Sequence, residues 1–178
     1  MKKLYHKKAL IEQGISYLQL DWFQKQFSAE ENQYQYEGIV VECGGEEEIA
    51  IGQEHIQAIE FVIENQEMIL KNILEALFKE YPNIQKKWID FYEKEEYKQR
   101  LPKVNNIQEL SYLITPDIVH IINVKKNGIC CIGFEFSCTW EEEHGLGFMT
   151  YQGKVCKIGD ASISFLSKIA QEVIKEEK

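Results

Sequence analysis

Basic residues are missing from a long stretch of this chain, since no Lys or Arg occurs between Lys25 and Lys71. The net charge of the whole chain is −9. The chain therefore has few cations with which to neutralise phosphates, and we expect no nucleic-acid partner. No apolar run approaches the roughly 20 residues of a membrane helix, and no long apolar stretch follows the basic N-terminus. We expect neither a membrane span nor a secretory signal.

The cysteines lack the spacing of a disulfide framework or a metal site. There are five of them, an odd number, and none forms a C-x-x-C pair. Most lie in predicted strands, where a free cysteine behaves as a small buried hydrophobic residue. We therefore expect inert thiols in a reducing, cytoplasmic setting, and we expect no cofactor.

The order of hydrophobic patterns predicts one α+β domain over residues 1–178, because strands and helices come in blocks and no βαβ alternation is sustained. The expected architecture is an antiparallel β-meander packed against two or three α-helices, with a further helix at the C-terminus. The expected blocks are N-terminal strands within 15–51 (15–23, 34–42 and 48–51), a helical segment over 53–113, a meander over 117–159 and a helix over 162–175.

Apolar spacings of three and four residues predict that the helical segment begins with a helix over 53–81. Gln66 interrupts its apolar stripe, which indicates a bend there. Pro82 is expected to end this helix and to open a second one over 83–97, because proline disfavours helical geometry in the residue before it. Asn106 is expected to cap a short third helix. The second helix is expected to bury Ile84, Trp88, Ile89 and Tyr92.

The meander is expected to begin with a hairpin, because Asn127-Gly128 is the sequence signal of a two-residue type I′ turn. With that turn, the numbers of paired residues sum to 255, so His120 is expected to face Glu135. A second hairpin is expected over 146–158, turning at a Gln-Gly pair. The predicted core face of the first hairpin is Val119, Ile121, Cys130, Ile132, Phe134, Phe136 and Cys138.

Between the two hairpins lies a loop over 138–147 that is dense in acidic residues. The stretch from about 129 to 165 resembles an uncharacterised bacterial domain family with the signature F-x-C-x-W-[DE]-x-E-H-G-[LV]-G and an I-G-x-A-D-like tail. The segments Ala58-Ile59-Glu60 and Glu64-Asn65-Gln66 resemble a further part of it, and Ser162 stands where an acid is common. The resemblance implies no established activity and, by association only, immunity proteins of toxin systems. The matching positions are Phe136, Cys138, Trp140, Glu141, Glu143, His144, Gly145, Leu146, Gly147 and Ile158-Gly159-Asp160-Ala161.

Two chemical interpretations of this loop stay open. In the first, carboxylates and imidazoles bind a divalent cation, although none of the recognised ligand spacings is present. In the second, Glu143 and His144 act as an acid–base pair for Cys138 or Ser137 as the nucleophile. The candidate metal ligands are Glu143, His144, His120 and Glu135.

A structural interpretation stands beside the chemical ones. Trp140 continues the alternation of the preceding strand and is expected to pack beneath the loop. Gly145 and Gly147 permit a positive φ or a close backbone approach. Glu143 and His144 would then hydrogen-bond backbone groups in a tight connection.

The interval without basic residues holds eleven glutamates, which form either a solvated face or a surface that steers a basic protein partner. The function that we expect is therefore a non-catalytic, acidic protein-binding module, with an immunity-type inhibitor of a bacterial toxin as its narrower form. The alternative is a metal-binding or hydrolytic enzyme that uses the loop 140–147. No catalytic residue is assigned. The predicted binding residues are Trp140, Glu141, Glu142, Glu143, His144, Glu46, Glu47 and Glu48.

Overall fold

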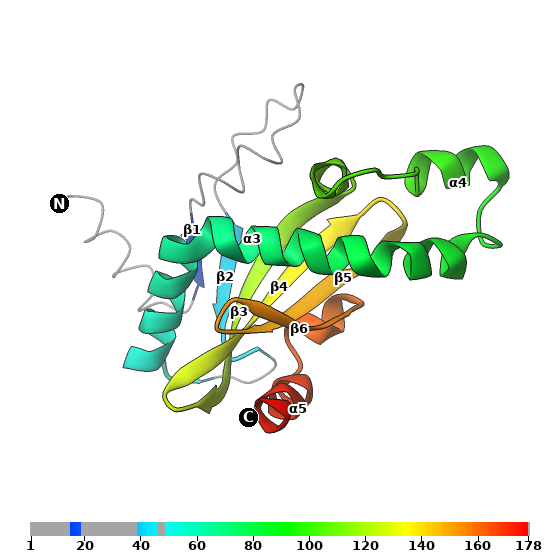
Figure 1. The fold of residues 1–178 in the computed structure, drawn as a ribbon. Helices are drawn as coiled ribbons and strands as arrows, with labels where there is room; N and C mark the ends of the chain where they lie inside the picture. The colour runs from blue at the N-terminus through cyan, green and yellow to red at the C-terminus, as the bar shows by residue number, and fades with distance from the viewer. Residues whose placement is uncertain (1–14, 19–38, 46–48, 178) are drawn as a thin grey trace.

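A six-stranded sheet in the order β1-β2-β3-β4-β5-β6 forms the centre of the computed structural model, which describes residues 15–18, 39–45 and 49–177. All neighbouring strands are antiparallel except β2 and β3, which are parallel because α3 and α4 lie between them in the chain. This arrangement confirms the predicted α+β class (Figure 1). The elements are β1 (Ile15–Leu18), β2 (Ile39–Cys43), α3 (Gln53–Trp88), α4 (Lys94–Arg100), the 3₁₀ helix η1 (Ile107–Tyr112), β3 (Ile114–Lys126), β4 (Ile129–Cys138), β5 (Glu141–Tyr151), β6 (Lys154–Gly159), the 3₁₀ helix η2 (Ala161–Ser164) and α5 (Ser167–Glu176).

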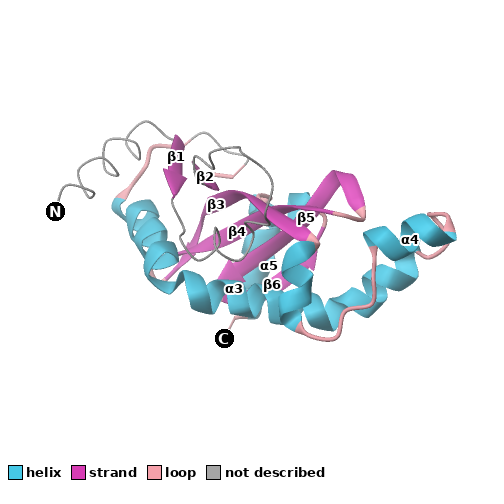
Figure 2. Ribbon diagram, turned by 90° about the horizontal axis from the view of Figure 1, so that it is seen from above, coloured by secondary structure: helices cyan, strands magenta, loops and turns pink. Residues whose placement is uncertain are grey.

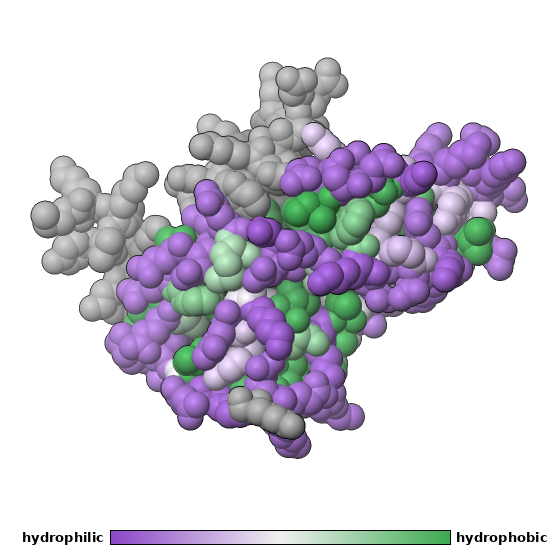
Figure 3. Space-filling model, in the orientation of Figure 1, coloured by the Kyte–Doolittle hydropathy of each residue, from purple (hydrophilic) through white to green (hydrophobic). Residues whose placement is uncertain are grey.

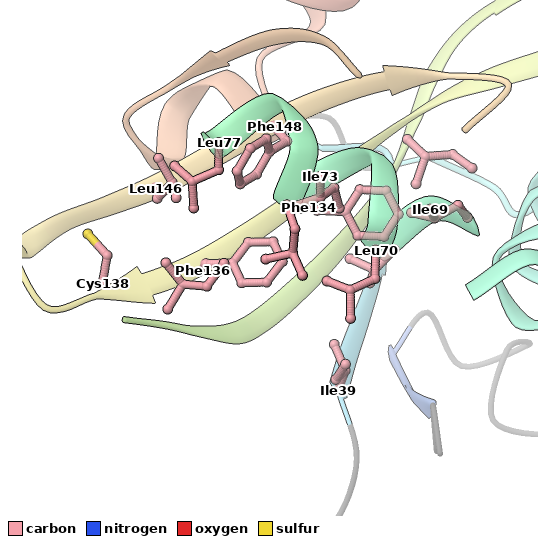
Figure 4. Close-up of a cluster of buried hydrophobic side chains, with 14 of the residues drawn as sticks. Ile39, Ile69, Leu70, Ile73, Leu77, Phe134, Phe136, Cys138, Leu146 and Phe148 are labelled. Carbon is pink, nitrogen blue, oxygen red and sulfur yellow. The ribbon is translucent and has the colours of Figure 1, made fainter. Parts of the chain in front are cut away.

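The sheet has helices on both faces, as the two ribbon views show together (Figures 1 and 2). The larger core lies between the sheet and α3, where Phe134, Phe136 and Phe148 meet Ile73 and Leu77 (Figure 4). Every residue of the predicted core face is buried there, so that prediction is confirmed. Sequence reasoning missed the smaller core beneath α5, which comprises Ile122, Cys131, Met149, Tyr151, Ala170 and Val173.

The first hairpin turns as predicted, since Asn127 and Gly128 have φ of 54° and 78°. Pairing near the turn also follows the prediction, but the register shifts between Ile121 and Lys125. His120 therefore lies opposite Gly133, and its predicted pairing with Glu135 is wrong. Because the shift amounts to two residues and side chains alternate with period two, the faces of both strands stay as predicted.

The helix α3 runs through Pro82, so the predicted end at Tyr81 is wrong. Proline inside a helix removes one backbone hydrogen bond and costs about 3 kcal/mol. Burial of Leu77 and Tyr81 in the core, and the hydrogen bond from the Tyr81 hydroxyl to the Pro102 carbonyl at 2.9 Å, offset that cost. The helix kinks at Asn65, next to the position where the sequence indicates a bend (Figure 1).

The second predicted helix is replaced by the end of α3, a turn, and α4. As a result Ile89 is 56% exposed and its predicted burial is wrong. Residues 49–51 are not in a strand, so the described part of the predicted strand at 48–51 is also wrong. Asn106 caps η1 by accepting the N–H groups of Gln108 and Glu109, as predicted.

The predicted strands at 15–23 and 34–42 are borne out at β1 and β2, and their other residues lie outside the described part of the chain. The second hairpin has its predicted turn, and residues 162–175 divide into η2 and α5. No helix within the described ranges combines the length and the apolar character that crossing a membrane requires.

Candidate functional site

The acidic segment after Cys138 is mostly strand and not the loop that the sequence predicts. Only Thr139 and Trp140 form the turn, and β5 begins at Glu141. Trp140 is 3% exposed and makes an edge-on contact with Tyr81 at 5.9 Å between ring centroids. Its packing beneath the turn matches the structural interpretation.

A bulge in β5 explains how this strand was missed. Phe136 pairs with Leu146, but Cys138 pairs with Glu141, so β5 has extra residues between these two pairs. The Glu141 carboxylate accepts the backbone N–H groups of Glu143 and His144 at 3.2 and 3.4 Å. The structural interpretation gave these backbone bonds to the side chains of Glu143 and His144, and on this point it is wrong: the Glu141 side chain accepts them, and Glu143 and His144 supply only their backbone N–H groups to these bonds.

At both glycines of the signature, the surrounding backbone leaves no room for a side chain. Gly145 has a φ of +60°, and a Cβ there would lie 2.7 Å from the Phe136 carbonyl oxygen. A Cβ at Gly147 would lie 2.4 Å from the Asp160 carbonyl oxygen. The signature and its tail are therefore in direct backbone contact across β5 and η2.

The bulge leaves Glu142, Glu143 and His144 exposed on one end of the sheet. Arg100 from α4 reaches this end, where it donates to Glu142 at 2.6 Å and also pairs with Glu96 at 2.8 Å. These two acceptors raise the pKa of Arg100. None of the described residues pairs with the Glu143 carboxylate.

The candidate metal ligands lie in two separate places. His120 is 3% exposed, and its Nε2 lies 2.9 Å from Glu135 Oε2 while its Nδ1 lies 3.6 Å from Glu42 Oε2. The His120–Glu135 contact is thus present, although across a diagonal of the sheet. His144 contacts Glu141 instead, at 3.4 Å. Over the described part of the chain, no three His, Cys, Asp or Glu side chains are placed to hold a metal ion.

Among the described residues, neither candidate nucleophile hydrogen-bonds to the side chain of Glu143 or His144. Cys138 is buried, which raises the pKa of its thiol to about 11, and its Sγ donates to the Glu141 carbonyl at 3.5 Å. Ser137 donates to Asp117 at 2.5 Å and not to an imidazole. Because a thiol nucleophile needs a neighbouring base or a lowered pKa, Cys138 is not activated by these contacts, and Ser137 contacts a carboxylate other than the predicted one.

The described members of the acidic interval do not share one surface. Glu60, Glu64 and Glu67 are exposed on α3. Glu54 pairs with Lys125, and Glu42 lies near His120 on the opposite face of the sheet. Glu46, Glu47 and Glu48 lie outside the described residues. At the signature, the acidic surface formed by the described residues is therefore limited to the segment Glu141–Glu143.

A cavity of about 190 Å³ adjoins this acidic end. One side is formed by the signature residues Trp140, Glu141 and Leu146 and by Asp160 of the tail. The other side is the last turns of α3, which sequence reasoning did not assign to the site. The spacing of three and four residues along α3 is the sequence signal that these side chains share one face of the helix. That face lies against the signature and consists of Glu80, Asn83, Ile84, Lys87 and Trp88.

Exposed apolar residues lie beside the same end, at the turn from α3 to α4 (Figure 3). Phe91 is 70% exposed and Ile89 is 56% exposed. Phe91 contacts Trp88 and Tyr92 with ring centroids 4.8 and 5.1 Å apart. The Tyr92 hydroxyl donates to the Trp140 carbonyl at 2.8 Å, which joins this turn to the signature.

Comparison with known proteins gives one family. The model described as "Domain of unknown function (DUF6985)" matches residues 12–166. This match agrees with the resemblance to an uncharacterised domain family. Comparisons with curated proteins and with solved structures give no match.

Proposed function

Since the chain belongs to the family of domains of unknown function DUF6985, we propose its function from its surface: it is a non-catalytic module that binds a basic protein. Binding uses one end of the molecule, which we call the docking end. The docking end consists of residues 88–92 at the turn after α3 and residues 141–144 at the start of β5.

The observation that carries this proposal is the exposure of Phe91 and Ile89, at 70% and 56%. Large apolar side chains that gather on a surface mark interaction sites, and aromatic residues are enriched in the energetic centres of interfaces. The rings of Trp88 and Tyr92 hold Phe91 in place, with centroids 4.8 and 5.1 Å from its own. Little side-chain entropy would then be lost on binding, which favours affinity.

Local charge supports a basic partner. The docking end contains three consecutive glutamates, of which Glu142 and Glu143 are exposed, and Arg100 pairs with Glu142. Residues 86–100 and 141–144 together hold seven acidic and five basic side chains, an excess of two carboxylates. An acidic rim around an apolar centre steers a positively charged protein into contact and raises its association rate.

The narrower form of the proposal is an immunity-type inhibitor that covers the basic cleft of a toxin. The sequence resemblance supports it by association, and the combination of apolar and acidic groups suits such a cleft. The enzyme alternative has weaker support, because its candidate residues His120 and His144 lie apart and each contacts a different glutamate.

Capture of partners from extracts of the native host tests the proposal. Wild type is compared with Ile89→Ala/Phe91→Ala and with Ile129→Ala, which removes an exposed apolar side chain (41%) beside the β3–β4 turn. We expect a basic protein that wild type and Ile129→Ala retain at low salt and that the double variant loses. The proposal fails if the same proteins bind all three forms, or if no basic protein is retained.

A second pair of variants separates charge from apolar contact. Glu142→Gln/Glu143→Gln removes two charges from the docking end, whereas Glu60→Gln/Glu64→Gln removes two exposed charges from α3. Association with the captured protein should slow by about tenfold in the first variant and much less in the second, since steering depends on charges near the contact. Equal rates for both variants would contradict a role of the acidic rim.

A further inference from the structure

The cavity beside the docking end has the size of one side chain. Its volume of about 190 Å³ is below the roughly 300–1,000 Å³ of sites for small molecules and cofactors. It opens between α3 and the β5–β6 edge, directly next to Trp88 of the docking end. We call this cavity the socket. Its position means that a partner seated on Phe91 could reach into it with a neighbouring residue.

Part of the lining of the socket is apolar and aromatic. Ile84, Leu146 and Ile158 line it, together with the indoles of Trp88 and Trp140. Such a surface suits the methylene stem of a long side chain, because lysine and arginine bury their stems on apolar atoms and keep their charged groups at a polar rim.

The polar groups of the socket favour a cation. Three carboxylates line it, those of Glu80, Glu141 and Asp160, against the single ammonium of Lys87. Each carboxylate accepts a hydrogen bond through one oxygen, from Asn83, from backbone N–H groups of the β5 bulge, and from Ser162, respectively. A carboxylate has about four acceptor positions, so each has capacity for a further donor.

The chain already places one cation at this site. The Lys87 ammonium lies 5.5 Å from the centroid of the Trp88 ring, within the roughly 6 Å of a cation–π contact. The Trp88 ring, which lines the socket, thus already accommodates an ammonium group at its face, and a cation from a partner would compete with Lys87 for it.

We propose that the socket receives one lysine or arginine side chain of the basic partner, with its stem on Ile84 and Leu146 and its charged group among the three carboxylates. This inference rests on the proposed function and names the group that the docking end recognises.

The test uses three synthetic peptides of one sequence that carry lysine, arginine or acetyl-lysine at the central positions. Binding is measured by calorimetry, and the indole N–H signals of Trp88 and Trp140 are followed by NMR. We expect the lysine or the arginine peptide to bind and to shift both signals, and the relative affinities of the two identify the preferred cation. The acetylated peptide, which lacks the charge, should bind at least about tenfold more weakly.

Matched variants separate the socket from general acidity. Glu80→Gln and Glu64→Gln remove the same charge from the same helix, but only Glu80 lines the socket. The first should weaken peptide binding by about fivefold, and the second by less than twofold. Ile84→Trp, which fills the socket, should abolish the NMR shifts, with circular dichroism confirming the fold.

The inference is overturned if neither cationic peptide binds, if acetylation has no effect, or if both glutamine variants weaken binding equally. These outcomes are distinct from failure of the proposed function. If the partner is lost with Ile89→Ala/Phe91→Ala but retained by Glu80→Gln and Ile84→Trp, the result supports the docking end and refutes the role of the socket.

Discussion

Replacing Gly133 by alanine should strongly destabilise the protein, because η2 lies directly on this residue. A Cβ at Gly133 would lie 1.6 Å from the carbonyl oxygen of Ser164, whereas ordinary contacts begin near 3.4 Å. The obstructing atom belongs to the backbone, so no side-chain rotation relieves the clash. Overpacking costs typically about 1–3 kcal/mol, and the short distance indicates the upper end, about 3 kcal/mol.

Urea denaturation followed by circular dichroism measures this effect as a lower midpoint. Gly52→Ala is the matched control, because its backbone φ of −98° suits alanine and its nearest atoms belong to the flexible Glu54 side chain. We expect the control to change the free energy of unfolding by less than about 1 kcal/mol. A Gly133→Ala protein as stable as the control would refute the close contact between η2 and the sheet.

Three further outcomes are expected. Pro82→Ala should raise the free energy of unfolding by about 1–3 kcal/mol, measured in urea, because alanine restores a helical N–H donor to the Phe78 carbonyl; an unchanged midpoint would contradict this. Burial raises the pKa of the Cys138 thiol to about 11, so iodoacetamide should alkylate it at neutral pH only upon unfolding. Mass spectrometry should find the half-buried Cys156 modified before Cys138, and equal rates at the two cysteines would argue against the burial of Cys138. Burial also raises the pKa of Asp117, so its contribution to stability is present at low pH and is lost as pH rises through its folded pKa. Asp117→Asn should remove that part of the pH dependence in thermal melts, and identical profiles would count against it.

The sequence predicts the hairpins and the α3-side core well, because both depend on local signals. The type I′ turn requires positive φ at both central residues, and Asn127-Gly128 suits it. The alternation of side chains along the strand assigns Phe134 and Phe136 to one face whatever the register. The register itself was less predictable, since the shift between Ile121 and Lys125 has no composition signal.

The errors in the helical segment have a tertiary cause. A proline normally ends a helix, but burial of Tyr81 and its neighbours keeps α3 continuous through Pro82. The second core beneath α5 was missed because the residues involved, such as Cys131 and Met149, alternate with those of the first core. A strand buried on both faces shows no polar side by which sequence could place a second layer.

The candidate site was predicted only in part. The signature indicates the right segment, but the sequence predicts a loop at its glutamates. The reason is a bulge, stabilised by Glu141, that interrupts the alternation of β5. The α3 residues Glu80 and Lys87 join the site only through the fold, which brings together segments some 60 residues apart. Exposure of Phe91 follows from the turn after Trp88, which the proline signal had placed inside a helix.

Hydrogen exchange of the chain with and without its captured basic partner tests the docking end most directly. We predict that the amides of 88–92 and 141–144 gain protection together, whereas those beside the β3–β4 turn, around the exposed Ile129, stay unchanged. Protection that falls instead on the exposed glutamates of α3 around Glu60–Glu67, with none at Phe91, would contradict the account.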